Sequence, residues 1–309
     1  MKKYLVGLDG GGTKTKCVVT DLQFNKLYEC VGGASNFLII GTEKVSETIF
    51  NLINDSIQKL GINYNEIASV LIGTTGAGRI EDADKLKNDF IEYSKSKGVE
   101  LKFFVESDAR IALEGAFSGK SGALLIAGTG SIIFGKDRNN KIYRVGGFGK
   151  LIGDEGSGTT LGKRGLNAIA KFFDGRGKKT ILVDYLKNDF NISDGQSLIS
   201  AVYRNNFDIA SFAPKVIEAA NQNDDEAIKI CEEETDELIL HVKSMFKLLN
   251  EEKMKLCLVG GIISNENFYS KLFKKKLNKE LSNVELVLPE YPPEMGAIFL
   301  ANEKINLPE

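Results

Sequence analysis

The sequence predicts an α/β protein built as two similar halves, and three observations support this fold class. A chain of 309 residues is too long for one ordinary hydrophobic core and suits two domains of similar size. Short apolar runs of strand character alternate with longer runs of helical periodicity. The third observation is a repeat, because each half begins with strand, Gly/Thr loop, strand, asparagine-containing turn, strand and a pair of glycines.

The first half is predicted to form one mixed α/β layer of strands and helices. Val45, Ile49 and Ile53 recur at helical spacing, with Thr42 as the expected N-cap of their helix. Strands are expected at 4–8, 14–21, 27–31, 67–72 and 101–105, and helices at 43–60, 81–97 and 107–117. The order β-β-β-α-β-α-β-α is typical of a mixed sheet with a hairpin at its edge.

The second half repeats the hairpin and then becomes mainly helical. Strands are expected at 122–127, 132–136, 142–145, 256–259 and 284–288, and helices within 155–249, from 265 onward and at 294–303. A Gly/Ser-rich stretch at 118–121 marks the boundary. We therefore expect domains at 1–118 and 119–293, the second with a helical insertion. The C-terminal helix 294–309 is a candidate addition to the first domain.

Composition and charge exclude several classes of function. Hydrophobic residues make up 42% of the chain, charged residues 27%, and the net charge is −2, so we expect no nucleic-acid or membrane partner. Asp9 and its neighbouring glycines interrupt the N-terminal apolar stretch, which excludes a signal peptide. No apolar run approaches the roughly 18 residues of a membrane helix. The expected location is therefore the cytoplasm.

Cysteine and histidine usage narrows the chemistry further. The four cysteines form no CxxC pair and read as buried small hydrophobic residues in a reducing compartment. The single histidine, His241, lies in a helical pattern. Because histidine-based catalysis then has little support, acid–base chemistry is expected from carboxylates.

A glycine-rich loop follows the first strand. In Asp9-Gly10-Gly11-Gly12-Thr13-Lys14, three glycines let backbone N–H groups approach an anion, and Thr13 adds a hydroxyl donor. Asp9, at the end of the apolar strand, is a candidate Mg²⁺ ligand, through water. The loop does not match the GxxxxGK[ST] pattern of P-loop proteins. The structural alternative is a tight hairpin that needs glycine for positive φ.

Two more glycine sites favour the anion-binding interpretation of this loop over the purely structural one. Gly128-Thr129-Gly130-Ser131 lies at the matching place in the second half, so the two hairpins could hold one triphosphate from opposite sides. Gly260-Gly261 ends a buried strand and would offer a flat surface to adenine or ribose. The combination predicts nucleotide binding by Gly10, Gly11, Gly12, Thr13, Lys14, Gly128, Thr129, Gly130, Gly260 and Gly261.

Four motifs resemble those of a known family. They are LDGGGTKT at 8–15, IAGTGS at 126–131, GGFGKLIGDEGSG at 146–158 and LVGGI at 258–262. In order and approximate spacing they resemble the N-acetylglucosamine kinase branch of the BadF/BadG/BcrA/BcrD ATPase family, within the actin/hexokinase/Hsp70 superfamily. The resemblance implies two actin-like (ribonuclease H-like) domains flanking a nucleotide cleft. It also implies ATP and Mg²⁺ as cofactors, a sugar substrate and a homodimer.

The resemblance also implies roles for individual residues. Thr13, Thr129 and Ala213 would contact ATP. Asp108, just after the strand 101–105, would be the base that accepts the proton of the C6 hydroxyl of N-acetylglucosamine. Without the resemblance, Asp108 or Ser107 could simply cap the next helix. The residues implied for the sugar are Asn36, Asp108, Gly146, Gly147, Phe148 and Asp154.

Two positions depart from the pattern of the family. Phe148 stands where relatives usually carry tryptophan, which keeps a flat apolar wall. Lys150 stands where proline or an uncharged residue is usual, and it could pair with the lactyl carboxylate of N-acetylmuramic acid. The alternative is that Lys150 is an ordinary surface lysine that faces solvent. Phosphorylation of N-acetylglucosamine at the C6 hydroxyl, in amino-sugar or cell-wall sugar salvage, is therefore the expected function, and N-acetylmuramic acid is a further candidate substrate.

Other functions stay open at this point. A kinase for glucosamine, N-acetylmannosamine or glucose would need only a small change in pocket shape. An electron-transfer activase would need cysteines for an iron–sulfur cluster, and none lies between Cys30 and Cys231. A non-catalytic sugar-responsive regulator would bind sugar without releasing ADP, so an ADP-release assay separates it from a kinase.

Overall fold

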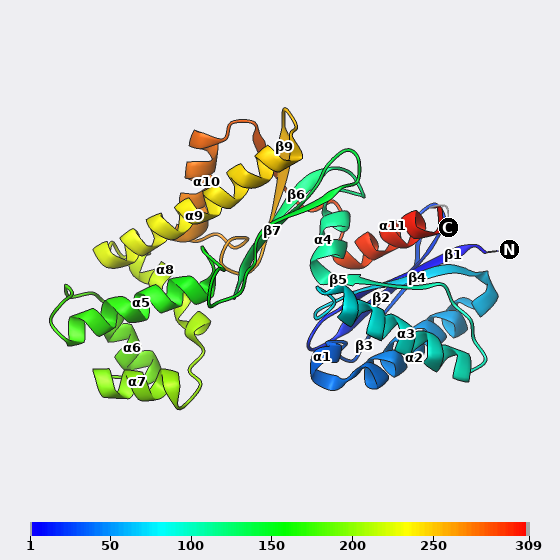
Figure 1. The fold of residues 1–309 in the computed structure, drawn as a ribbon, viewed down its shortest axis with the longest axis horizontal. Helices are drawn as coiled ribbons and strands as arrows, with labels where there is room; N and C mark the ends of the chain where they lie inside the picture. The colour runs from blue at the N-terminus through cyan, green and yellow to red at the C-terminus, as the bar shows by residue number, and fades with distance from the viewer. Residues whose placement is uncertain (1, 307–309) are drawn as a thin grey trace. The chain divides into compact units, whose positions relative to one another are not determined.

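The computed structural model describes residues 2–306, which divide into two compact units. Unit 1 contains the described residues up to 121 and those from 288 onward, and unit 2 contains residues 122–287. Figure 1 shows that each unit combines one sheet with helices. The chain thus returns to unit 1 at its C-terminal end.

Unit 1 has a five-stranded mixed sheet in the order β3-β2-β1-β4-β5. Its strands are β1 (Tyr4–Gly10), β2 (Thr15–Asp21), β3 (Lys26–Gly32), β4 (Ile67–Thr74) and β5 (Phe103–Ser107). Its helices are α1 (Phe37–Ile40), α2 (Thr42–Leu60), η1 (Tyr64–Glu66), α3 (Ile80–Ser96), α4 (Asp108–Ala116) and α11 (Pro293–Asn306). The pairs β1–β2 and β2–β3 are antiparallel, and β1–β4 and β4–β5 are parallel.

Helices cover both faces of this sheet, with α2 and α3 on one side and α4 and α11 on the other (Figure 1). All eight residues of β4 are buried, as expected for a parallel strand enclosed on both faces. The α11 helix approaches α4 very closely, since a Cβ on Gly296 would lie 1.9 Å from the Ile111 carbonyl oxygen. The α11 helix also lies against the sheet, since a Cβ on Gly7 of β1 would clash with the Glu294 carbonyl oxygen and Ser69 Oγ of β4 donates to the Ala301 carbonyl oxygen.

Unit 2 has a second five-stranded mixed sheet, in the order β10-β9-β6-β7-β8. Its strands are β6 (Gly122–Ala127), β7 (Ser131–Lys136), β8 (Ile142–Gly146), β9 (Met254–Val259) and β10 (Val284–Val287). Its helices are α5 (Gly158–Phe173), α6 (Leu182–Phe190), α7 (Gly195–Tyr203), η2 (Ile209–Phe212), α8 (Ala213–Asn221), α9 (Asp225–Leu249) and α10 (Phe268–Glu280).

The two sheets share one topology. In unit 2, β6–β7 and β7–β8 are antiparallel while β6–β9 and β9–β10 are parallel, so β8-β7-β6-β9-β10 repeats the arrangement of unit 1. The predicted α/β class with mixed sheets is confirmed, and so is the repeat of strand, glycine loop, strand, turn and strand. The glycine loops occupy equivalent places, between β1 and β2 and between β6 and β7.

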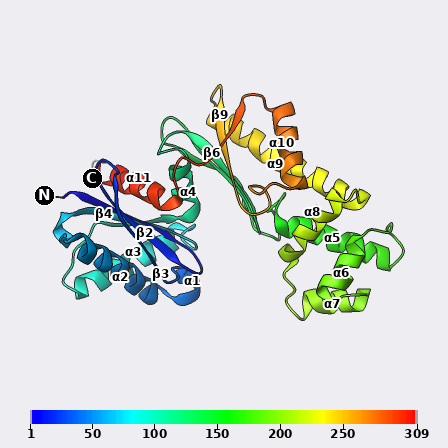
Figure 2. The ribbon, with the colours of Figure 1, turned by 180° about the vertical axis from the view of Figure 1, so that it is seen from behind.

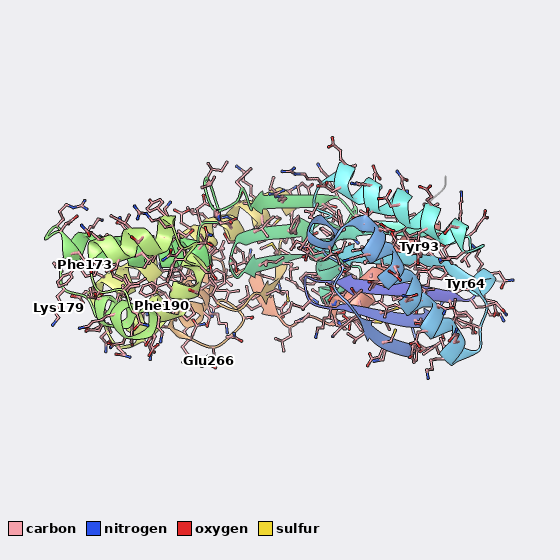
Figure 3. The ribbon with its side chains drawn as sticks, turned by 90° about the horizontal axis from the view of Figure 1, so that it is seen from below. Tyr64, Tyr93, Phe173, Lys179, Phe190 and Glu266 are labelled. Atoms are coloured by element: carbon pink, nitrogen blue, oxygen red, sulfur yellow. The ribbon has the colours of Figure 1, made fainter. Side chains whose placement is uncertain are left out.

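The helical insertion of unit 2 shares one hydrophobic core with the sheet, since Leu182, Leu186 and Leu198 are buried in the same cluster as Ala123 and Leu125. Figures 1 and 2 show α6 and α7 at the end of the unit farthest from its sheet. Phe190 of α6, labelled in Figure 3, packs edge-to-face on Phe207 and Phe212 with ring centroids 5.3 and 5.6 Å apart. A comparable aromatic cluster lies in unit 1, where Tyr64 and Tyr93, both labelled in Figure 3, pack on the ring of Phe50.

Several local predictions need correction. Gly41, not Thr42, is the N-cap of α2, because the short helix α1 ends immediately before it. The strand predicted at 101–105 runs from 103 to 107, since its last residues pair with the end of β4. The helix expected from 265 starts at 268, where Asn267 caps it. Cys30 is half-buried, whereas the other three cysteines are buried as predicted.

Among residues 2–306, no helix combines the length and apolarity that crossing a bilayer requires.

Candidate functional site

The glycine loop of unit 1 is open to a ligand. The Gly11 N–H donates to the Lys14 carbonyl oxygen at 3.0 Å and closes the turn between β1 and β2. Gly12, Thr13 and Lys14 are exposed. A Cβ placed on Gly12 would meet no atom within 4 Å, so the space beside this backbone is free. The loop can therefore present N–H groups and the Thr13 hydroxyl to an anion.

Asp9 lies half-buried at the base of this loop. Burial, together with the negative charges of Glu294 and Asp108, raises the pKa of its carboxyl to about 6, although Lys16 and Lys14 act in the opposite direction. Glu294 has one carboxylate oxygen 3.5 Å from Lys16 Nζ and the other buried without a hydrogen-bond partner. An ionised Asp9 here lacks full compensation, and a bound cation would supply it.

This electrostatic cost predicts that Asp9→Asn stabilises the ligand-free protein. The folded state holds the Asp9 proton more tightly than the unfolded state, so the cost is complete above pH 6 and absent below the ordinary value of 3.8. We expect a gain of roughly 1 kcal/mol at pH 8 after allowing for solvent screening, declining toward pH 4. Urea denaturation at both pH values measures it.

Asp21→Asn is the control of opposite sign. Hydrogen bonds from Asn25 lower the pKa of Asp21, so its replacement should remove stability at neutral pH. An Asp9→Asn variant that is less stable than the wild type at pH 8 would contradict the account.

Asn36 is held beside the same strand ends. The Ser35 N–H donates to the Gly11 carbonyl oxygen at 3.0 Å, and Thr74 Oγ1 donates to the Ser35 carbonyl oxygen at 2.8 Å. Asn36 is the N-cap of α1, yet its side chain makes no capping bond, and its Oδ1 is buried without a hydrogen-bond partner. Such an oxygen is costly unless a ligand donates to it.

Asp108 is the first residue of α4, directly after β5. Its Oδ2 accepts from Thr75 Oγ1 at 2.9 Å and its Oδ1 from the Ala109 N–H at 2.7 Å. Ser107 is the N-cap, accepting from the Arg110 N–H at 3.2 Å. Because Ser107 already caps the helix, capping alone does not account for the carboxylate. The sequence did not point to Thr75, whose only signal was its place in a Thr/Gly run after β4.

The glycine loop of unit 2 is anchored on the start of α5. The Gly158 N–H donates to the Gly128 carbonyl oxygen at 2.7 Å, and Thr159 donates to the Thr129 carbonyl oxygen through both its N–H and its hydroxyl. Thr129 is exposed at the tip. This docking aligns the loop with a helix N-terminus, where anions are favoured.

Ala213 and Gly260 lie beside this loop. A Cβ on Gly158 would be 3.6 Å from the Ala213 Cβ, and one on Gly128 would be 4.0 Å from the Gly260 Cα. Gly260 has φ of 110°, and a Cβ there would clash with the Ala127 carbonyl oxygen at 2.2 Å, so only glycine fits. Gly261 next to it faces open space. The nucleotide residues predicted in this half thus form one group.

The segment after β8 carries the residues predicted for the sugar. Gly146 and Gly147 have φ of 71° and 73°, and their carbonyl oxygens both accept from the Arg144 guanidinium. A Cβ on Gly146 would lie 2.3 Å from His241 Nε2, so the buried histidine supports this turn. Phe148 is 68% exposed, with Arg144 5.9 Å from its ring centroid. Lys150 is also exposed.

Asp154 links this segment to the glycine loop. Asp154 itself has φ of 59°. A Cβ on Gly130 would come within 3.0 Å of Asp154 Oδ2. The Glu155 carbonyl oxygen accepts from Ser131 Oγ at 2.5 Å. The structure therefore places the Asp154 carboxylate against the loop that is predicted to hold phosphate.

A buried carboxylate that the sequence did not reveal supports this region. Glu234 of α9 is 4% exposed, accepts from the Gly156 N–H at 2.7 Å and pairs with Arg164 at 2.8 Å. Tyr269 Oη donates to the Gly156 carbonyl oxygen at 2.9 Å. Both polar groups of Gly156 are thus held from distant parts of the chain.

Glu234→Ala should destabilise unit 2 by about 2–4 kcal/mol, because it leaves a buried N–H and one guanidinium contact unpaired. Guanidinium chloride denaturation measures the loss. Glu233→Ala is the matched control, since Glu233 also pairs with Arg164 but is 46% exposed, and its loss should stay below about 1 kcal/mol. Equal losses in the two variants would contradict the assigned anchoring role.

Comparison with known proteins agrees with these features. The model of the BadF/BadG/BcrA/BcrD ATPase family matches residues 6–301. An N-acetylmuramic acid/N-acetylglucosamine kinase of Clostridium acetobutylicum is 34% identical over 309 residues, covering 98% of this chain and 100% of the relative. A protein of known structure from Chromobacterium violaceum has a TM-score of 0.70 at 24% identity, covering 97% of this chain and 99% of its own.

The ROK hexokinase of Thermus thermophilus has a TM-score of 0.62 at 16% identity, covering 96% of this chain and 97% of its own. At this identity the likeness concerns the fold, which agrees with the expected actin- and hexokinase-like class. The motifs, the fold and the match over nearly all of the sequence lead to one conclusion: the chain belongs to the BadF/BadG/BcrA/BcrD ATPase family.

Proposed function

We propose that this protein is an ATP-dependent sugar kinase that phosphorylates the C6 hydroxyl of N-acetylglucosamine and also accepts N-acetylmuramic acid. The name of the Clostridium acetobutylicum relative supports the choice of sugars. The observation that carries the reaction type is the Asp108 carboxylate, oriented through both oxygens by Thr75 and the Ala109 N–H. A carboxylate held in this way can accept the proton of a sugar hydroxyl as that oxygen attacks phosphorus.

The residues proposed for the sugar have complementary chemistry. The unpartnered Asn36 Oδ1 would accept from a sugar hydroxyl, which would remove the cost of burying it. In unit 2, Gly146, Gly147 and Asp154 would offer backbone groups and a carboxylate to further hydroxyls. The exposed ring of Phe148 would stack against an apolar face of the sugar.

The residues proposed for ATP fit a polyphosphate. Thr13 and Lys14 with Gly10, Gly11 and Gly12 would bind phosphate oxygens in unit 1, and Gly128, Thr129 and Gly130 would do so in unit 2. Ala213, Gly260 and Gly261 would leave room for the nucleoside, since the space beside Gly261 is empty of protein atoms. Backbone N–H groups arranged before the reaction stabilise charge on the transferring phosphoryl group without reorganising.

Asp9 is the residue proposed to hold Mg²⁺. Mg²⁺ supplies neutralisation of the charge on the phosphates, and it is usually bound by one or two carboxylates, phosphate oxygens and water. The raised pKa of Asp9 fits this role, since its ionised form lacks a cation. Within residues 2–306, no cluster of three or more metal-ligating side chains is present, so phosphate and water would complete the coordination.

A panel of sugars tests the proposal. ADP release with ATP and Mg²⁺ is measured for N-acetylglucosamine, N-acetylmuramic acid, glucosamine, N-acetylmannosamine and glucose. We expect the highest kcat/KM for the first two sugars. A higher value for glucosamine, N-acetylmannosamine or glucose would select that alternative, and sugar binding without ADP release would identify a non-catalytic regulator.

Lys150→Ala should raise KM for N-acetylmuramic acid selectively. The exposed ammonium would pair with the lactyl carboxylate, and removing such a pair is expected to raise KM roughly fivefold, about 1 kcal/mol. Steady-state kinetics with both sugars measures the change, with the exposed Lys253→Ala of unit 2 as control. Equal changes in KM for the two sugars would remove the proposed contact.

The remaining expectations concern partners and location. We propose a cytoplasmic homodimer with no nucleic-acid partner, on the basis of the resemblance and the net charge of −2. Light scattering of the purified chain tests the oligomeric state, and a monomer at all concentrations would contradict it.

A further inference from the structure

Two cysteines of unit 1 face each other across neighbouring antiparallel strands. Cys17 of β2 is the register partner of Cys30 of β3. Residues directly opposed in an antiparallel pair have Cα atoms about 4.5–5.5 Å apart, within the range of about 4.4–6.8 Å that disulfides span. Their side chains also lie on one face of the sheet. The backbone therefore permits a disulfide without a shift of either strand.

The two thiols share a neighbour on α2. Ser56 Oγ lies 3.9 Å from Cys17 Sγ and 3.6 Å from Cys30 Sγ. Cys30 Sγ also lies 3.8 Å from the Leu52 carbonyl oxygen, to which Ser56 donates at 2.7 Å. Both sulfurs thus point toward the same turn of α2, which brings them into the same small volume.

The thiols differ in their access to solutes. Cys17 is 1% exposed, whereas Cys30 is half-buried and lines a cavity of about 300 Å³ with Thr48, Asn51 and Asp55. A small solute that enters this cavity reaches Cys30 first. Cys17 lies behind it and is placed to react only with the Cys30 sulfur.

The thiols also differ in reactivity. A hydrogen bond from Cys17 lowers the pKa of Cys30 to about 7, and the same contact with burial raises that of Cys17. The thiolate, which is the nucleophilic form, is therefore favoured at Cys30 over Cys17. Burial raises the pKa of Cys257 to about 11 and that of Cys231 to about 12, so these two thiols are inert by comparison.

We propose that Cys17 and Cys30 are a modification site, a reversible dithiol–disulfide pair in which Cys30 reacts first with hydrogen peroxide. The Cys30 thiolate attacks one peroxide oxygen, an S–O bond forms, the O–O bond breaks and hydroxide leaves. The Cys17 sulfur then attacks the Cys30 sulfur. An S–S bond forms, the S–O bond breaks, and the hydroxyl leaves as water with the Cys17 proton. A dithiol reductant returns two electrons and two protons.

Mass spectrometry of the full chain tests this site. Reduced protein is treated with hydrogen peroxide at pH 7, the remaining thiols are alkylated in urea, and the chain is digested without reductant. We expect a peptide pair that joins Cys17 to Cys30 and is lost with dithiothreitol, while Cys231 and Cys257 are alkylated. A chain that keeps all four thiols, or that oxidises Cys231 or Cys257 first, would overturn the proposal.

Variants separate the two steps. Cys17→Ala should abolish the cross-link and leave a Cys30 sulfenic acid that dimedone captures, and Cys30→Ser should leave Cys17 reduced. Cys257→Ala is the control and should form the cross-link like the wild type. In the unmutated native protein, iodoacetamide should label Cys30 at least about tenfold faster than Cys17, which tests the order of reactivity even if a variant does not fold. Dimedone capture on wild-type Cys30 with no cross-link would overturn the pair.

Discussion

Asp108→Asn should lower kcat by about 10²–10⁴-fold while the affinity for the sugar changes little. The amide keeps the size of the carboxylate and can still contact Thr75, but it cannot accept the proton of the sugar hydroxyl. Binding needs only hydrogen bonds, whereas transfer needs a base, so the two readouts should separate. Steady-state kinetics and calorimetry with N-acetylglucosamine measure them.

Ser107→Ala is the matched control for Asp108→Asn. Ser107 caps α4 through the Arg110 N–H, and losing this bond should cost about 1 kcal/mol of stability with kcat nearly unchanged. If Asp108→Asn behaved in the same way, keeping most of its turnover and losing only stability, its carboxylate would belong to the helix start and the base would lie elsewhere.

Gly12→Val should raise KM for ATP by roughly 10–100-fold, because hydrogen bonds to charged groups contribute about 1.5–3 kcal/mol and the new side chain would hold the phosphates away. The fold should tolerate the change, since no atom lies within 4 Å of the added Cβ. Initial rates over a range of ATP concentrations measure it, and thermal unfolding checks the fold.

Gly195→Val provides the control for this effect. Gly195, in unit 2, also has open space around its Cβ position, but it begins α7 and has no proposed part in ATP binding. KM for ATP should stay at the wild-type value in this variant. If Gly12→Val left KM for ATP unchanged as well, the loop of unit 1 would not hold the nucleotide.

The glycine loops could be predicted from the sequence because their physics is local. Several glycines at the end of an apolar strand indicate either an anion-binding loop or a tight hairpin. The second copy at Gly128–Gly130 favoured the anion-binding loop. The repeat also predicted that each half would begin with the same run of strand, glycine loop, strand, turn and strand, as both halves do. The place of Asp108 after a strand agreed with a site residue but equally with a helix cap, and only the resemblance made it the expected base.

The side chains that position or influence the site residues could not be predicted, because their roles depend on contacts between segments that are distant in the sequence. Thr75 reaches Asp108, Glu234 reaches Gly156, and Glu294 acts on Asp9 only after α11 returns to unit 1. Each of these side chains looked like an ordinary polar residue of a loop or helix. Cys30 was expected to be buried because it lies in a short apolar run. Such a run does not distinguish the edge strand β3 from a strand in the middle of the sheet.

Correlated ¹H–³¹P NMR of the reaction product identifies the sugar hydroxyl that receives the phosphoryl group. The protein is incubated with ATP, Mg²⁺ and N-acetylglucosamine until ADP is released, and the phosphorus is correlated with the sugar protons. We expect a phosphate coupled to the C6 protons, formed in equal amount to ADP. Release of ADP without any phosphorylated sugar, or a phosphate on another carbon, would contradict the proposed reaction.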